Sequence, residues 1–210
     1  MKKCFTLLIV MMIPIFLFGE SYSSLWKKVE AASEKDLPQT EYELLQKIVA
    51  KAEKGKDYGQ LLTAELQSAD VMGHIAPDSL KPAMERLQQR YEATTDVVLK
   101  TVYQTALHRI YSRNSTLGMT IDEPVLTPEL CEQLAKVKDT AYSPFVIKGV
   151  DAGIFNNDLL HVVGYEVDNY RSWKELYDYY KKVGNRRAAC MIASRVYYYA
   201  SKDELDAVIK

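Results

Sequence analysis

Apolar residues recur every three or four positions along most of the chain after position 20, which is the spacing of one face of an α-helix. The first such face consists of Leu25, Val29 and Ala32, and residues 36–38 (DLP) interrupt the pattern. Strict alternation of apolar and polar residues, which would indicate a β-strand, does not occur in the sequence. The pattern therefore predicts an all-α fold.

Four further helices are expected between residues 40 and 112, because each apolar stripe there follows a residue that can cap a helix. The last of the four carries Val102, Ala106 and Arg109 along one stripe. We expect helices that begin at Thr40 and end at Gly55, begin at Asp57 and end near Gly73, begin at Asp78 or Ser79 with Pro82 in the first turn, and begin at Asp96.

The pattern is looser between residues 112 and 155, where glycines and prolines are scattered among short apolar groups. One helix is expected there, since Thr127 can cap it, Pro128 suits its first position and Glu129 its first turn. Regular spacing then returns. Further helices are expected to begin at residues 156–158 and end at Gly164, to begin at Asn169 or Ser172 and end at Gly184, to begin at Asn185, and to begin at Ser201.

The spacing of the helix starts indicates a repeat. Starts near residues 24, 40 and 57 are 16 and 17 residues apart, and those at 169, 185 and 201 are 16 apart, so each helix pair spans about the period of a tetratricopeptide repeat. Trp173, Leu176, Tyr180 and Ala189 match four positions of that repeat. The sequence thus predicts a right-handed array of antiparallel helix pairs, a tetratricopeptide-like α-solenoid that is irregular in the middle, with an ordinary helical bundle as the alternative.

The N-terminal segment is typical of a secretory signal peptide. Lys2 and Lys3 precede an apolar run over residues 5–18, and Gly19 is followed by polar residues. A membrane anchor is the competing interpretation, but it needs roughly 20 apolar residues, and this run is shorter and contains Pro14. We expect residues 1–19 to be removed on export and residues 20–210 to form one helical-repeat domain.

The composition excludes a basic nucleic-acid-binding protein. The chain has 27 Lys and Arg against 28 Asp and Glu, a net charge of −1, and two of the cations lie in the signal segment. Tyrosine is frequent, with 15 copies, and it suggests either a binding surface for a peptide or protein or the packing of helix against helix. The candidate interaction surface is Tyr177, Tyr179, Tyr180, Tyr197, Tyr198 and Tyr199.

Candidate chemistry is sparse. His161 follows Asp158 by about one turn, and the pair is the basis for one alternative function, a small hydrolase. The sequence has no nucleophile-elbow motif and no phosphate loop, and neither Cys131 nor Cys190 has a second ligand at zinc spacing. We therefore expect no catalytic, cofactor-binding or metal-binding residue, and whether the two cysteines form a disulfide is left open.

Several segments resemble the N-terminal helical region of bacterial alpha-2-macroglobulin-like envelope proteins. They are residues 24–30 (SLWKKVE), 36–40 (DLPQT), 155–166 (FNNDLLHVVGYE) and 176–190 (LYDYYKKVGNRRAAC). In that family the helical region precedes β-sandwich domains, and the best-known members trap proteases with a bait segment and sometimes a thioester. Residues 131–133 (CEQ) lack the thioester spacing, so the resemblance assigns no inhibitory residue to this chain.

Together these observations predict a non-catalytic protein-interaction module. The resemblance implies an endopeptidase-inhibitor protein in the periplasm or cell envelope of a Gram-negative bacterium, with a protein partner or downstream domains and no nucleic acid. The expected last helix, residues 201–210, leaves its apolar face uncovered, so we expect the chain to be the leading segment of a longer protein. The alternatives are a free-standing domain that binds peptides or glycans and the small hydrolase.

Overall fold

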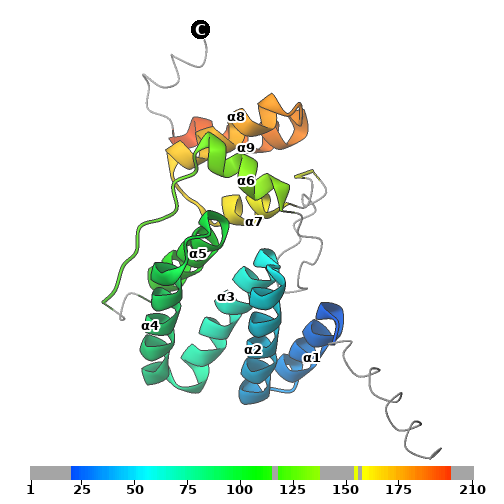
Figure 1. The fold of residues 1–210 in the computed structure, drawn as a ribbon, viewed down its shortest axis with the longest axis vertical. Coiled ribbons are helices and arrows are strands. Elements are labelled where there is room, and N and C mark those ends of the chain that lie inside the picture. Colours follow the sequence, from blue (N-terminus) through cyan, green and yellow to red (C-terminus); the bar gives the residue numbers. More distant parts are fainter. Residues whose placement is uncertain (1–19, 115–117, 138–153, 156–157, 200–210) are drawn as a thin grey trace, which may run out of the picture.

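The computed structural model describes residues 20–114, 118–137, 154–155 and 158–199. Every regular element in these residues is an α-helix, which confirms the predicted fold class (Figure 1). The predicted signal peptide at residues 1–19 and the predicted helix from Ser201 lie outside the described residues. The helices are α1 (Tyr22–Glu34), α2 (Pro38–Gly55), α3 (Tyr58–Ile75), α4 (Pro77–Ala93), α5 (Val97–Arg113), α6 (Pro128–Lys136), α7 (Leu159–Glu166), α8 (Tyr170–Lys182) and α9 (Arg186–Tyr199).

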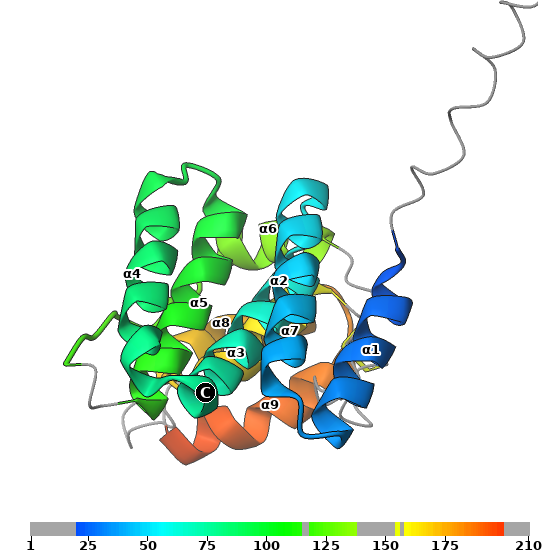
Figure 2. The same ribbon diagram turned by 90° about the horizontal axis from the view of Figure 1, so that it is seen from below.

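Helices that follow one another in sequence are also neighbours in space. α2 packs between α1 and α3, and α3 contacts both α4 and α5. Figures 1 and 2 show α1 and α4 on opposite sides of this group. α5 then contacts α6 and α7, α6 contacts α8, and α8 pairs closely with α9. The helices α6 to α9 therefore gather at one end of the first five helices (Figure 1).

Most predicted helix starts with a side-chain cap are confirmed. The Asp96 carboxylate accepts hydrogen bonds from the amides of Val98 and Leu99, as expected for an N-cap. Gly184, with φ of 76°, lies just after α8, as predicted. The same capping role is filled by Thr127 in α6, Asp158 in α7, Asn169 in α8 and Asn185 in α9.

The predicted starts of α2 and α4 were wrong. α2 begins at Pro38, so Thr40 lies in its first turn and does not cap it. α4 begins at Pro77, which places Pro82 in the second turn instead of the first. Proline fits the first position of a helix because its fixed φ suits the helix and its missing N–H would have no partner there. These two prolines therefore begin their helices without a side-chain cap.

The predicted helix ends at glycines are confirmed in part. α2 ends at Gly55, as predicted, and the left-handed position after it is taken by Lys56, with φ of 57°. α3 continues past Gly73 to Ile75, and α7 continues past Gly164 to Glu166. A Cβ atom on Gly164 would lie 3.0 Å from Leu176 Cδ1, so this glycine permits close packing of α7 against α8.

The four residues that match the tetratricopeptide pattern belong to the core. All four are buried where α8 and α9 pack together: Trp173, Leu176 and Tyr180 on α8, and Ala189 on α9. The start of α9 lies 16 residues after that of α8, as predicted, and the start of α2 lies 16 after that of α1. α3 begins 20 residues after α2, so the expected even spacing does not extend to that helix.

Hydrogen bonds of Ser172 link the segment before α6 to the start of α8. This side chain is fully buried, and its hydroxyl accepts a hydrogen bond from the Leu126 amide at 3.1 Å. The hydroxyl also donates to the Pro124 carbonyl at 3.4 Å. Segments 46 and 48 residues apart in sequence are thereby held together in the interior.

Candidate functional site

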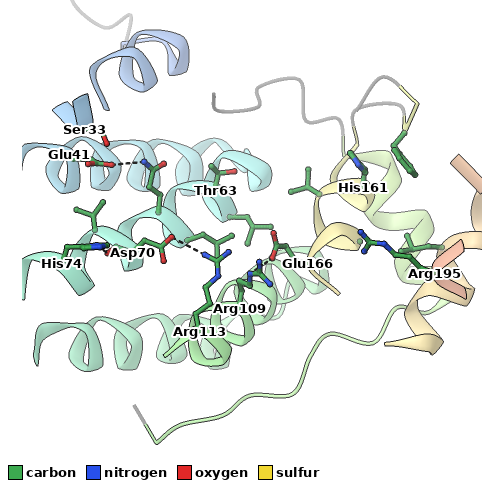
Figure 3. A pocket seen from close by; sticks show the side chains of 18 of the residues that line it. Ser33, Glu41, Thr63, Asp70, His74, Arg109, Arg113, His161, Glu166 and Arg195 are labelled. Carbon is green, nitrogen blue, oxygen red and sulfur yellow. Dashed lines mark hydrogen bonds and ion pairs between the residues drawn. The ribbon is translucent and has the colours of Figure 1, made fainter. Parts of the chain in front are cut away.

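A pocket of about 960 Å³ lies between the first group of helices and α7 to α9 (Figure 3). α2 and α3 form one wall, α5 supplies two arginines, and α7, α8 and α9 form the opposite wall. We call this cavity the interhelical pocket. Its volume is in the range of sites for small molecules, which is roughly 300 to 1,000 Å³.

Aliphatic side chains from several helices form part of the wall of the interhelical pocket. Leu62 and Leu66 reach it from α3, Val162 from α7, and Leu176 and Ile192 from α8 and α9. These helices turn their apolar faces toward one another, and the side chains that cover the core also border the cavity. A ligand with apolar groups could therefore remove its own apolar surface from water here.

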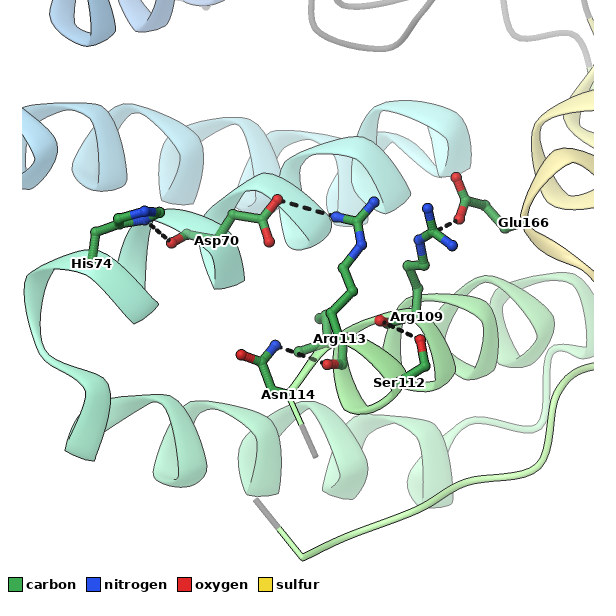
Figure 4. Close-up of polar contacts among 8 residues, drawn as sticks. Asp70, His74, Arg109, Ser112, Arg113, Asn114 and Glu166 are labelled. Carbon is green, nitrogen blue, oxygen red and sulfur yellow. Dashed lines mark hydrogen bonds and ion pairs between the residues drawn. The ribbon is translucent and has the colours of Figure 1, made fainter. Parts of the chain in front are cut away.

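Two arginines one turn apart on α5 form the polar side of the pocket (Figure 4). Arg109 Nε lies 3.1 Å from Glu166 Oε2 of α7, an ion pair without an aligned hydrogen bond. Arg113 donates from Nη1 to Asp70 Oδ2 of α3 at 3.3 Å. Each guanidinium group is thus held by one carboxylate, and the two carboxylates come from different helices.

Further polar atoms in the pocket wall lack a hydrogen-bond partner among the described residues. Gln67 donates through Nε2 to Glu41 Oε1 at 2.9 Å, and its buried Oε1 accepts no hydrogen bond. The buried indole Nε1 of Trp173 donates none, although the Arg195 guanidinium lies 4.3 Å from the centre of the Trp173 ring. Buried polar atoms are usually paired, so these two unpaired atoms are exceptions.

The hydrolase alternative was based on Asp158 and His161. The Asp158 carboxylate contacts the backbone amide of His161. Asp158 is buried, and its Oδ1 accepts a hydrogen bond from the His161 backbone amide at 2.9 Å, which caps α7. The His161 ring lines the interhelical pocket and stacks on Phe155, with ring centres 4.4 Å apart. The Asp158 carboxylate therefore serves as the N-cap of α7, and this structural role explains why Asp158 lies three residues before His161.

The other histidines contact main-chain carbonyl groups. His74 Nδ1 lies 2.7 Å from the Asp70 carbonyl, and His108 Nδ1 lies 3.0 Å from the Ile121 carbonyl. Within the described part of the chain, no group of three or more His, Cys, Asp or Glu residues is arranged to hold a metal ion.

The cysteines differ in their environment. Cys131 is buried and Cys190 is exposed, and the structure has both as free thiols. Burial raises the pKa of the Cys131 thiol to about 12, so this thiol stays protonated at neutral pH. A protonated thiol is a poor nucleophile and metal ligand, which leaves Cys131 a packing residue of α6.

The candidate tyrosine surface is divided by the structure. Tyr180 is fully buried and lines the interhelical pocket, so it is not a surface residue. Tyr177 and Tyr179 are partly buried against the core, whereas Tyr197 and Tyr198 are 46% and 82% exposed. The side chain of Tyr199 lies outside the described residues. The described rings therefore occupy different environments instead of one common face.

The candidate site residues that sequence reasoning missed are those of the interhelical pocket. Asp70, Arg113 and Glu166 come from three helices and carry no local motif that connects them. One signal was present in the sequence, because Arg109 falls on the apolar stripe of its helix. A charged residue at such a position faces other helices and needs a partner there, which Glu166 supplies.

Comparison with known proteins identifies no relative of this chain. No protein-family model matches the chain, and no curated protein and no solved structure gives a significant match. Among the helices that the structure describes, none combines the length and the apolar character needed to span a membrane.

Proposed function

We propose that this chain is a non-catalytic helical-repeat module of an exported protein, and that it binds a peptide segment of a protein partner in the interhelical pocket. The pocket itself is the observation that carries the proposal. It has aliphatic side chains in its wall for the apolar side chains of a peptide, and it has polar and charged side chains for the peptide's polar groups.

The repeat character of the module is supported by α8 and α9. Their starts are 16 residues apart, and the four residues that match the tetratricopeptide pattern pack between or beside them. The proposed tetratricopeptide-like array places successive helix pairs side by side, and arrays of this kind use concave surfaces to bind extended ligands. An interhelical pocket lined by helices from both ends of the described chain is consistent with such a surface.

A peptide fits the pocket better than a glycan does. An open aromatic face is the apolar platform on which a sugar ring stacks. In this pocket the Phe155 ring faces His161, the Trp173 ring faces Arg195, and Tyr180 is fully buried. The rest of the wall combines aliphatic with polar and charged side chains, and this mixture suits the side chains and main-chain groups of a peptide.

A pocket-filling variant tests the proposal. Peptides are selected from a displayed random library on the full chain and are then measured by fluorescence anisotropy. Val162→Trp places a large ring in the pocket, and we expect it to weaken binding by about tenfold or more because apolar contact area is lost. Val97→Trp is the matched control, since Val97 is 53% exposed and lies away from the pocket.

Two results would contradict this function. The first is a completed selection that enriches no peptide. The second is that the enriched peptides bind the Val162→Trp variant as tightly as they bind the Val97→Trp control. Thermal unfolding of both variants ensures that a loss of binding is not a loss of fold. A peptide that is cleaved by the chain, and is not cleaved by His161→Ala, would favour the hydrolase alternative.

The proposed context of the module rests on the sequence. The signal-like pattern supports export to the periplasm or cell envelope, and the segments quoted above support a place in an alpha-2-macroglobulin-like protease-trapping protein. The gene provides the test. An in-frame continuation that codes for β-sandwich domains would support this context, whereas a stop codon followed by unrelated sequence would count against it.

A further inference from the structure

The two arginines of α5 suggest what the peptide must carry. Arg109 and Arg113 are four residues apart, so both guanidinium groups lie on the same face of the helix and border the interhelical pocket (Figures 3 and 4). Guanidinium is planar and presents its N–H donors in a fixed fork that matches a carboxylate. Two such groups side by side can contact both oxygens of one carboxylate.

Each guanidinium group is oriented by a protein carboxylate but keeps donors for a ligand. Arg109 approaches Glu166 through Nε, which leaves both Nη groups without a partner among the described residues. Arg113 uses Nη1 for Asp70, and its remaining donors likewise contact no described residue. An arginine that is held in place before binding loses less side-chain entropy when the ligand arrives.

The donors that Arg109 and Arg113 leave unused favour an anionic group. Each of these arginines already pairs with one carboxylate, Glu166 or Asp70, through a single nitrogen atom. A ligand carboxylate would pair with the remaining N–H donors of both arginines. Binding a charged group in a partly buried site is favourable when it is paired in this way.

The opposite end of the pocket has the other sign. Asp36 and Glu41 line it where α1 leads into α2, and no arginine or lysine lines the pocket beside them. A negative group of the ligand would be repelled there. The charge distribution therefore gives the peptide a direction, with its acidic end at α5.

We infer that the interhelical pocket recognises a carboxylate of the bound peptide, either at its C-terminus or on an acidic side chain, through Arg109 and Arg113. This inference deepens the proposed function and rests on it for the peptide nature of the ligand. The carboxylate accepts hydrogen bonds from the unused N–H donors of both arginines, and the apolar side chains next to it occupy the aliphatic part of the pocket.

The test compares three small probes, of which two carry a carboxylate at different positions and the third is neutral. N-acetyl-Phe-Leu with a free carboxylate, its C-terminal amide, and N-acetyl-Phe-Glu amide are each titrated into the ¹⁵N-labelled full chain, and backbone amide shifts are followed. We expect at least one of the two acids to bind about tenfold more tightly than the neutral amide, with the largest shifts in α5. The two acids distinguish a terminal carboxylate from a side-chain carboxylate.

Arginine variants complete the test. Arg113→Met should remove the preference for the acid, and its side chain is 46% exposed, so the fold should tolerate the change. Arg109→Met should act in the same direction, with thermal unfolding measured because Glu166 loses its partner. Arg86→Met is the matched control, since Arg86 is exposed on α4 and does not line the pocket.

The inference is overturned if the acids and the neutral amide bind equally, if none of the probes shifts α5, or if Arg113→Met binds the acids as the wild-type chain does. Each of these results is compatible with the proposed function, provided that the selected peptides still bind Val162→Trp more weakly than they bind the Val97→Trp control. Failure of the Val162→Trp experiment, in contrast, would remove the proposed function itself.

Discussion

Replacing Glu65 by glutamine should remove a loss of stability that the wild-type protein suffers as the pH rises. Glu65 lies on α3 with its side chain 12% exposed, and its Oε1 is 3.1 Å from Arg90 Nη1 of α4. Glu53 of α2 lies nearby and accepts a hydrogen bond from the Tyr103 hydroxyl at 2.8 Å. Burial raises the pKa of Glu65 from its ordinary value of 4.5 to about 7, and Arg90 only partly opposes this effect.

The direction of the pH dependence follows from the raised pKa. A carboxyl group whose pKa is higher in the folded chain binds its proton more tightly there, so the fold is favoured while the group is protonated. This contribution is complete below pH 4.5 and is lost as the pH rises to about 7 and beyond. The difference between the two pKa values corresponds to about 3 kcal/mol.

Glutamine has the same shape, keeps a carbonyl oxygen for Arg90 and does not titrate. We therefore expect the free energy of unfolding of Glu65→Gln to exceed that of the wild type by up to about 3 kcal/mol at pH 8, and the difference to shrink toward pH 5. Urea denaturation followed by circular dichroism at pH 5, 6, 7 and 8 measures it. Glu30→Gln, at an exposed position of α1, is the matched control.

The reasoning would be refuted by a difference that does not change between pH 5 and pH 8. It would also be refuted if Glu65→Gln were less stable than the wild type at pH 8, because the ion pair with Arg90 would then outweigh the burial of the charge.

Three further predictions follow from local geometry. Gly164→Ala should destabilise the fold by about 1 to 3 kcal/mol because its Cβ meets a leucine of α8, whereas Gly73→Ala, with nothing within 4 Å, should stabilise α3 by about 0.5 to 1 kcal/mol in urea denaturation. Asp96→Ala should lower the free energy of unfolding by about 1 kcal/mol through loss of the α5 cap, as measured in the same way. Iodoacetamide should modify Cys190 in the native protein and spare Cys131, as mass spectrometry of the labelled peptides would show.

Helix starts could be predicted where the signal was a single side chain. Asp96 and Asn185 cap their helices through one carboxylate or amide oxygen, and the sequence alone locates such a residue. The glycine signals were less consistent, because α2 ends at Gly55 as predicted, whereas α7 continues past Gly164 to Glu166. A residue from another helix, Leu176, determines why Gly164 is small, and this cannot be read from nearby positions.

The interhelical pocket shows the same limit more strongly. Its polar side depends on distances between Asp70, Arg113 and Glu166, which lie on α3, α5 and α7. The spacing of residues within one helix predicts which face each occupies but not which helices meet. Tyr180 illustrates the point, since its position in a tyrosine-rich segment suggested a surface and its contacts place it in the core.

The buried hydroxyl of Ser172 has a consequence for the order in which the chain folds. Contacts among α1 to α5 join helices that are adjacent or nearly adjacent in sequence, so they form with little loss of chain entropy. The bonds of Ser172 to Leu126 and Pro124 close loops of 46 and 48 residues. The topology therefore favours early assembly of the first five helices, followed by slower docking of α8, and the two-sided pocket is complete only after that last step.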